Sequence, residues 1–289
     1  MKIKIIVVNI FVLFFLLFIF SCSSRPKPLN EITDLRRRAE SQLELANKQA
    51  DRGELENALT FANEAKRLAV SADDPALRVR TGLSRGNVLF SLGRVDEAEV
   101  EWNEALAEAE RAGNSELTAV SRIHIARGKL LSPGGKASAQ SVRDETNRNL
   151  SQIKSSRHYT AFAWTVIGLA EKELGRYAAA EAALRRSLDI HEKDRFFELA
   201  AYDWFLIASF RSLSGNSGGA RQALESALTL DRRMENSWGL ANDWRAFGDI
   251  EKKAGNSEAA RAAYTRAAGI FRALMQDEIA EETLQRMGN

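Results

Sequence analysis

The sequence has one cysteine, four prolines and three histidines in 289 residues, and these low counts exclude several classes of protein. A single cysteine cannot form a disulfide within the chain, so no disulfide framework holds this fold together. Four prolines and 18 glycines exclude collagen-like and proline-rich chains. Because 45% of the residues are apolar, the chain also differs from disordered proteins, which are poor in such residues.

An excess of charge of either sign is also missing. The chain has 41 Lys and Arg residues against 39 Asp and Glu residues. Lys2 and Lys4 lie in the segment 1–21, which contains no acid, so the rest of the chain has equal numbers of positive and negative side chains. This balance argues against a nucleic-acid partner, because binding to phosphates depends on a positive field.

Patterns typical of catalytic or metal sites do not occur in the sequence. His124, His158 and His191 lie more than thirty positions from one another, which gives no short spacing of metal ligands. The chain has no HExxH motif, no CxxC motif and no glycine-rich phosphate loop. We therefore predict a protein that is not an enzyme, with no catalytic residues, no metal and no cofactor.

The N-terminal segment is strongly apolar. Lys2 and Lys4 precede an apolar stretch from Ile5 to Phe20, which is interrupted at Asn9. A membrane-spanning helix needs about 20 residues, which is more than this stretch provides. Small residues follow directly, beginning at Ser21, so residues 1–21 are predicted to be a signal peptide.

The sequence Ile19-Phe20-Ser21-Cys22 resembles a bacterial lipobox, although Phe20 occupies a position that usually holds a small residue. The resemblance implies cleavage before Cys22, acylation of Cys22 with palmitate-type chains, and attachment to a membrane of the bacterial cell envelope. Residues 22–31 would then be a lipidated cysteine followed by an extended tether with two prolines. The alternatives are an inert cysteine after an ordinary signal peptide and an uncleaved anchor.

A forty-residue repeat runs through the rest of the chain. The tryptophans Trp164, Trp204 and Trp244 are each followed eleven positions later by a glycine, and five positions beyond each glycine stands an alanine. The glycine series is Gly53, Gly93, Gly175, Gly215 and Gly255. Apolar residues on both sides of each glycine follow the helical period, so each unit is predicted to be two helices joined by a glycine turn.

Glycines also recur seven positions before the turn, at Gly86, Gly168 and Gly248. A glycine inside a helix costs about 1 kcal/mol relative to alanine. We therefore expect the two helices of a unit to approach closely at this level.

The pattern of Trp164, Gly168, Gly175, Tyr177 and Ala180 resembles the tetratricopeptide repeat (TPR), although that repeat usually has about 34 residues. The resemblance implies an all-α, right-handed α-solenoid of about six antiparallel helix pairs over residues 32–275. Residues 276–289 would form a C-terminal cap. The third unit, about residues 113–153, is degenerate because its turn contains Pro133 and its second helix is polar.

The same resemblance implies that the first helix of each pair lines a concave groove for a protein or peptide. Trp164, Trp204 and Trp244 would pack between helices rather than form a ligand cage. An Asn at Asn47 or Asn87 could bind a peptide carboxylate with the help of basic residues, but Leu43 stands where that clamp needs Lys. The residues predicted to contact the partner are Asn47, Arg80, Asn87, Arg122, Phe162, Tyr202, Phe205 and Arg245.

From these patterns we expect a lipid-anchored protein that serves as a non-catalytic scaffold or assembly factor, on the periplasmic face or at the outer membrane. The alternative is a helical-repeat subunit of periplasmic solute uptake that binds a small ligand or a transport protein.

Overall fold

The computed structural model describes residues 34–288, and the array of helices discussed below is the unit Leu35–Asn289. The signal peptide predicted at residues 1–21, Cys22 and the tether at residues 22–31 lie outside the described residues. Residues 34–288 form α-helices and one 3-10 helix and contain no strand. No helix in this part of the chain is both long and apolar enough to cross a membrane.

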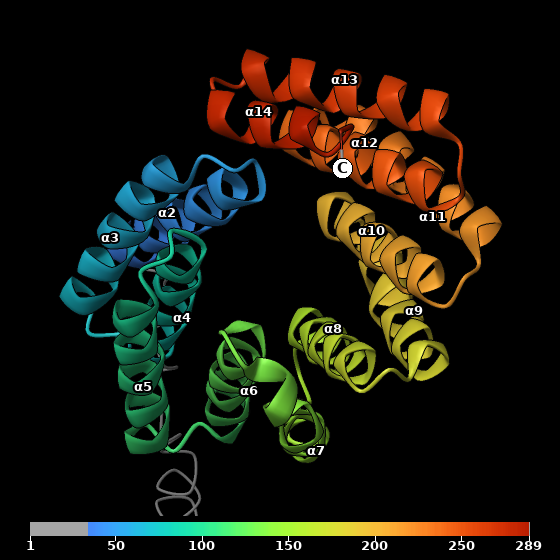
Figure 1. Cartoon of the computed structure of the whole chain (residues 1–289). Coiled ribbons are helices and arrows are strands. Elements are labelled where there is room, and N and C mark those ends of the chain that lie inside the picture. The colour runs from blue at the N-terminus through green and yellow to red at the C-terminus, as the bar shows by residue number, and fades with distance from the viewer. Residues whose placement is uncertain (1–33, 289) are drawn as a thin grey trace, which may run out of the picture. The chain divides into compact units, whose positions relative to one another are not determined.

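The helices are arranged as six consecutive pairs, followed by one additional helix (Figure 1). The pairs are α2 (Asp34–Asp51) with α3 (Leu55–Ser71), α4 (Pro75–Ser91) with α5 (Val95–Arg111), α6 (Ser115–Leu131) with α7 (Ala139–Leu150), α8 (Arg157–Glu173) with α9 (Tyr177–Lys193), α10 (Phe197–Leu213) with α11 (Ser217–Met234), and α12 (Ser237–Lys253) with α13 (Ser257–Ala273). The all-α solenoid of about six helix pairs is confirmed.

Turns within units alternate with turns between units along the array, and only the turns within units can be predicted from glycines in the sequence. Within units, the residue with positive φ is a glycine at Gly53, Gly93, Gly175, Gly215 and Gly255. Between units, the corresponding residue is a glycine only at Gly113. Four further turns between units place residues with side chains in the left-handed region, at Asp73, Arg195, Glu235 and Met275, and the turn between α7 and α8 has no residue with positive φ.

Met275 offers a test of this strain. Its φ is 58° and its side chain is 89% exposed, so it occupies a strained conformation without gaining contacts. We expect Met275→Gly to increase the free energy of unfolding by about 0.5–1 kcal/mol, because relief of the Cβ clash outweighs the added backbone entropy of glycine. The melting temperature measures this increase. Met275→Ala keeps the Cβ and should give no gain, and equal effects of the two variants would contradict the explanation.

The buried face of each pair consists of small residues opposite larger ones. The alanine five positions after each turn glycine is buried, with Ala58, Ala98, Ala180, Ala220 and Ala260 at most 4% exposed. At Gly168 the helices approach as expected, because an added Cβ would lie 3.2 Å from the backbone oxygen of Ala180. At Gly86 the space is filled by a side chain, since an added Cβ would lie 2.4 Å from Nε1 of Trp102.

The third unit departs from the period. Its first helix begins at Ser115, and the next unit begins at Arg157, two positions later than the interval of the neighbouring units would place it. The extra residues lie in the turn, where Gly134 has positive φ and a 3-10 helix, η1 (Gly135–Ser138), precedes the short helix α7. The repeated tryptophan is the eighth residue of its helix in α8, α10 and α12. The eighth residue of α6 is Arg122.

The three repeated tryptophans are half-buried rather than enclosed. The guanidinium carbon of Arg186 lies 4.3 Å from the ring centre of Trp164, and that of Arg266 lies 4.4 Å from Trp244. The indole N–H of Trp204 donates to Glu192. Trp204 and Trp244 also pack against buried apolar clusters, and each of the three rings is contacted by a charged side chain of a second helix.

The two ends of the array contact each other. A Cβ added to Gly53, in the turn between α2 and α3, would lie 2.4 Å from Cδ2 of Trp238 near the start of α12, so the indole lies against the Gly53 backbone. Trp238 also packs edge-on against Phe271 of α13, with ring centres 5.5 Å apart. Helix α14 (Asp277–Gln285) covers α13 and buries Ala280 and Thr283.

Candidate binding site on the inner wall

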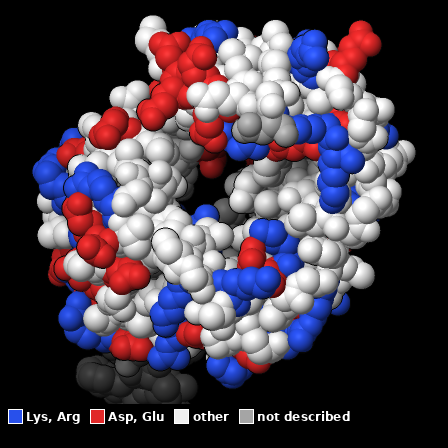
Figure 2. Space-filling view, in the orientation of Figure 1, with Lys and Arg blue, Asp and Glu red and all other residues white. Residues whose placement is uncertain are grey.

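The first helices of the pairs surround a central opening, which Figure 2 shows in the orientation of Figure 1 with Lys, Arg, Asp and Glu residues around its rim. We use the name inner wall for a set of neighbouring side chains on four first helices: Asn87 of α4, His124 and Arg127 of α6, Phe162 of α8, and Tyr202 and Phe205 of α10. Helices α6 and α10 are separated by α8, yet Arg127 and Tyr202 are within electrostatic range of each other. Both side chains therefore reach the same inner region.

Two pairs of stacked rings belong to this wall. The ring of Phe162 stacks on His124 with centres 4.3 Å apart and planes 25° apart. Tyr202 and Phe205 lie nearly parallel, with centres 6.3 Å apart. Phe162 and Phe205 pack against the same buried cluster, whereas Tyr202 is 45% exposed. Phe162 and Phe205 are thus held by the same core, and Tyr202 is accessible to a partner.

His124 is held as a neutral side chain. Its Nδ1–H donates to Oδ1 of Asn87 at 3.0 Å, since an amide oxygen can only accept. Burial lowers the pKa of His124 to about 3, and the positive charge of Arg127 contributes to the same shift. The ring therefore presents an uncharged face to Phe162 at neutral pH.

Arg127 has no salt bridge and no hydrogen bond to any residue of the described chain, whereas Arg80 and Lys172 of neighbouring first helices are paired with carboxylates. Its side chain is half-buried. Burial lowers the pKa of Arg127, and the nearby Tyr202 opposes this shift. A guanidinium retains its charge under these conditions, so the wall contains one uncompensated positive charge.

The predicted polar contact residues are distributed differently from the aromatic ones. Arg80 pairs with Glu40 at 3.3 Å, and Asn47 accepts a hydrogen bond from Ser84 at 2.7 Å. The side chains of the predicted asparagine clamp, Asn47 and Asn87, are therefore already hydrogen-bonded within the chain.

Arg122 and Arg245 lie away from the aromatic wall. Arg122, at the tryptophan position of α6, pairs with Glu110 of α5 at 2.9 Å. Arg245 donates to Asn242 and lies over the ring of Phe271, on the side covered by the last helices. The structure therefore gives neither residue a contact with Phe162, Tyr202 or Phe205.

Arg127 is not among the predicted contact residues, because counting backward from Gly135 as the turn glycine places His124, and not Arg122, at the tryptophan position of the third unit. Counting from the helix start instead, after the N-cap Asn114, places Arg127 at the position that Asn87 occupies in the second unit. The third turn is two residues longer than the others, so a count backward from its glycine is wrong by two positions. The N-cap Asn114 marks the start of the helix and is the sequence signal that gives the correct count.

A buried polar network between α8, α9 and α10 superficially resembles catalytic machinery. Nδ1 of His191 donates to Asp203 at 2.7 Å, and Ser187 Oγ lies 3.4 Å from the same nitrogen. A serine and an aspartate that share one ring nitrogen cannot relay a proton through the imidazole. His191 is 4% exposed and Asp203 is 1% exposed, so the network serves the core.

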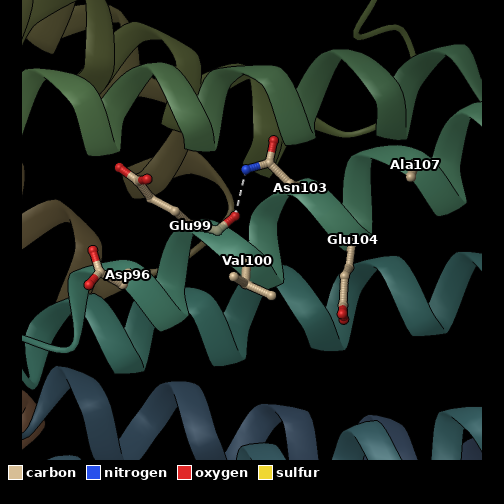
Figure 3. A pocket seen from close by; sticks show the side chains of 6 residues that line it. All are labelled: Asp96, Glu99, Val100, Asn103, Glu104 and Ala107. Atoms are coloured by element: carbon tan, nitrogen blue, oxygen red, sulfur yellow. Dashed lines mark hydrogen bonds between the residues drawn. The ribbon is translucent and has the colours of Figure 1, made fainter.

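Two surface depressions lie outside the inner wall. Figure 3 shows the first, whose lining side chains, Asp96, Glu99, Val100, Asn103, Glu104 and Ala107, all come from α5. The second is lined by Asp249, Lys252, Lys253, Tyr264 and Arg286. In the described part of the chain, no group of three or more His, Cys, Asp or Glu residues is placed to hold a metal ion.

Comparison with known proteins agrees with this architecture. The sequence model of the tetratricopeptide repeat family matches residues 163–194, which include most of α8 and all of α9. No curated protein matches the sequence of this chain. The chain contains a tetratricopeptide repeat and has the fold of tetratricopeptide-repeat proteins, as its sequence pattern indicates.

Three solved structures illustrate the similarity of fold. A Rap protein complexed with competence and sporulation factor is 14% identical, with a TM-score of 0.60 over 87% of this chain and 74% of that chain. BtubC from P. vanneervenii is 17% identical, with a TM-score of 0.55 over 84% and 92%. PilW, a widely conserved type IV pilus biogenesis factor, is 18% identical, with a TM-score of 0.53 over 87% and 98%. These identities show the fold alone.

Proposed function

We propose that this protein is a non-catalytic scaffold or assembly factor of the bacterial cell envelope that captures a segment of another protein on its inner wall. The observation that carries the proposal is the aromatic surface of Phe162, Tyr202 and Phe205 beside the unpaired Arg127. Aromatic and arginine side chains dominate the binding energy of protein interfaces. In this chain they come from three successive first helices, where Tyr202 stacks on Phe205 and Arg127 is within electrostatic range of Tyr202.

The known proteins with this fold support a role in binding and assembly. One of them, a Rap protein, was solved in complex with competence and sporulation factor, and another, PilW, is a pilus biogenesis factor. The N-terminal sequence adds the proposed location. Acylation at Cys22 with more than one chain would anchor the protein stably, since a single acyl chain gives only marginal binding.

The test is cross-linking in cells, followed by purification from the membrane fraction and mass spectrometry. A protein with a photo-reactive residue at position 202 should cross-link to one protein in stoichiometric amount, and its N-terminal peptide should carry a diacylglycerol on Cys22. An unmodified N-terminus further along the chain would contradict anchoring. A small molecule that raises the melting temperature, with no protein captured, would favour the solute-uptake alternative.

Replacement of Tyr202 and Phe205 by Ala should weaken capture of that partner at least tenfold, because truncation of interface aromatics costs about 2 kcal/mol or more each. Capture efficiency and the helical circular-dichroism signal are measured together. Val100→Ala, an exposed residue on the outer face of α5, is the control and should change neither. Undiminished capture by the double variant, with its helical signal intact, would overturn the role of this wall.

A further inference from the structure

The contact between the two ends of the array depends on one aromatic ring. The indole of Trp238, near the start of α12, lies so close to the Gly53 backbone that an added Cβ would collide with it. In the described part of the chain, no hydrogen bond or ion pair joins the turn 49–54 to α10, α11 or α12. Neighbouring units have such links, for example between Arg211 of α10 and Glu181 of α9 at 2.8 Å. The end-to-end junction can therefore open more easily than the contacts between neighbouring units.

Two carboxylates from opposite ends of the array act against this contact, because like charges repel. Asp51, the last residue of α2, is within electrostatic range of Glu198 in the first turn of α10. Glu198 is also within electrostatic range of Asp231 of α11, whose carboxylate lies against Gly239, the residue after Trp238. The carboxylate of Asp51 is therefore placed beside the same junction that the indole closes.

No ion pair neutralises the repulsion between Asp51 and Glu198. Neither carboxylate has a salt bridge or a side-chain hydrogen bond within the described residues. On its own side of the junction, Asp51 is flanked along the chain by Lys48, Arg52 and Glu54, none of which pairs with it. Burial raises the pKa of Asp51 from 3.8 to about 6, and the charge of Glu198 across the junction contributes to the same shift.

We propose that this junction is a proton-sensitive latch, in which Trp238 closes the array into a ring while Asp51 is neutral and the ring opens when Asp51 is ionised. The inference does not rest on the function proposed above. A closed ring admits a polypeptide only when a chain end threads through the opening, whereas an open array receives a continuous segment from the side. The latch therefore regulates access to the inner wall.

Closure of the ring takes up a proton. In the closed form Asp51 has a pKa of about 6, whereas in the open form it lies away from Glu198 and has its ordinary pKa of 3.8. Between these values Asp51 is protonated in the closed form and ionised in the open form, so the closed form loses stability as the pH rises through this window. We expect the ratio of closed to open molecules to fall about tenfold between pH 5 and pH 7.5.

Small-angle X-ray scattering at pH 5 and pH 7.5 tests the latch in the chain from residue 23 onward, which lacks only the predicted signal peptide and acylation site. Trp238→Ala removes the indole and gives the radius of gyration of the open array. We expect the wild type to be more compact than Trp238→Ala at pH 5 and to move toward its radius at pH 7.5. Asp51→Asn cannot ionise and should stay compact at both pH values. Glu56→Gln neutralises an exposed acid of α3 and should respond to pH as the wild type does.

The indole N–H signal of Trp238, observed by NMR, gives a second readout and should shift between pH 5 and pH 7 in the wild type but not in Asp51→Asn. Asp51→Ser is also uncharged and repeats the test, and the helical circular-dichroism signal shows that each variant is folded. A wild-type radius that does not change with pH, or a Trp238→Ala radius equal to that of the wild type at pH 5, would overturn the proposal. A pH response retained in Asp51→Asn would also overturn it, because the response would then belong to another group such as Asp231.

Discussion

Asp243→Asn is expected to stabilise the protein at neutral and alkaline pH, although it changes a buried residue. The carboxyl group of Asp243 in α12 is 1% exposed and faces that of Asp231 in α11, which is 3% exposed. Burial raises the pKa of Asp243 to about 9, and the charge of Asp231 contributes to the same shift. One oxygen of Asp243 has no acceptable partner unless it carries a proton that it can donate to Asp231.

The sign of the pH dependence follows from these pKa values. Between its ordinary value of 3.8 and about 9, Asp243 is protonated in the folded chain and ionised in the unfolded chain. Folding therefore takes up a proton, and stability falls as the pH rises through this window by up to about 1.4 kcal/mol per unit. An Asn at this position donates to Asp231 without a proton from solvent. We expect the variant to match the wild type near pH 4 and to exceed it by about 1–3 kcal/mol at pH 8.

The preceding unit offers a matched control. Forty positions earlier, the equivalent residues are His191 and Asp203, which form a complementary buried pair at 2.7 Å. Asp203→Asn should destabilise the chain by about 1–3 kcal/mol, because it removes a charge-assisted hydrogen bond. Denaturant unfolding of both variants from pH 4 to pH 9 is the measurement. A gain in stability for Asp203→Asn as well, or an unchanged pH slope in Asp243→Asn, would contradict the shared proton.

Gly53→Ala is expected to separate the first and last units of the array. The φ of Gly53 is +75°, so a Cβ is strained there, and it would also lie 2.4 Å from Cδ2 of Trp238. Left-handed strain costs about 1–2 kcal/mol, and forcing atoms into a packed contact costs a further 1–3 kcal/mol or so. We expect the indole to leave the turn, because the ring is not covalently bound to α2 or α3 and can move more easily than either helix.

Gly93→Ala is the control that separates the backbone strain from the contact with Trp238. Gly93 has nearly the same φ, +76°, but nothing lies within 4 Å of an added Cβ. Both variants should lose stability through strain, whereas only Gly53→Ala should increase the radius of gyration in small-angle scattering and shift the indole N–H signal of Trp238. The same scattering curve for both variants would mean that the contact between Gly53 and Trp238 does not hold the ends together.

The sequence predicts the fold well because the fold depends on local signals. Turn glycines, a regular repeat interval and apolar residues at helical spacing are properties of neighbouring residues, and they indicate the helix pairs directly. The turns between units escaped prediction because Asp73, Arg195, Glu235 and Met275 adopt a conformation usually associated with glycine. Stabilisation from the packed helices outweighs the strain at these positions.

The site could be predicted only in part. Phe162, Tyr202 and Phe205 were found because their positions follow the period of regular units. Arg122 was assigned to the groove, but a two-residue extension of the third turn places it beside Glu110 and places Arg127 on the inner wall instead. Successive side chains of an α-helix point in directions about 100° apart. An error of two residues in the assigned register therefore places a side chain on the wrong face of the helix.

The sequence by itself determined the helical content, the repeat length, the position of the glycine turns and the near-neutral charge, since each depends on composition or on residues close in the chain. Only the tertiary structure decided which buried polar residues face each other. Asp203 and Asp243 occupy the same position in successive units, yet one faces His191 and the other faces Asp231. It also decided that Arg127 has no partner among the described residues and that Gly53 contacts Trp238, because both depend on packing between units that are distant in the sequence.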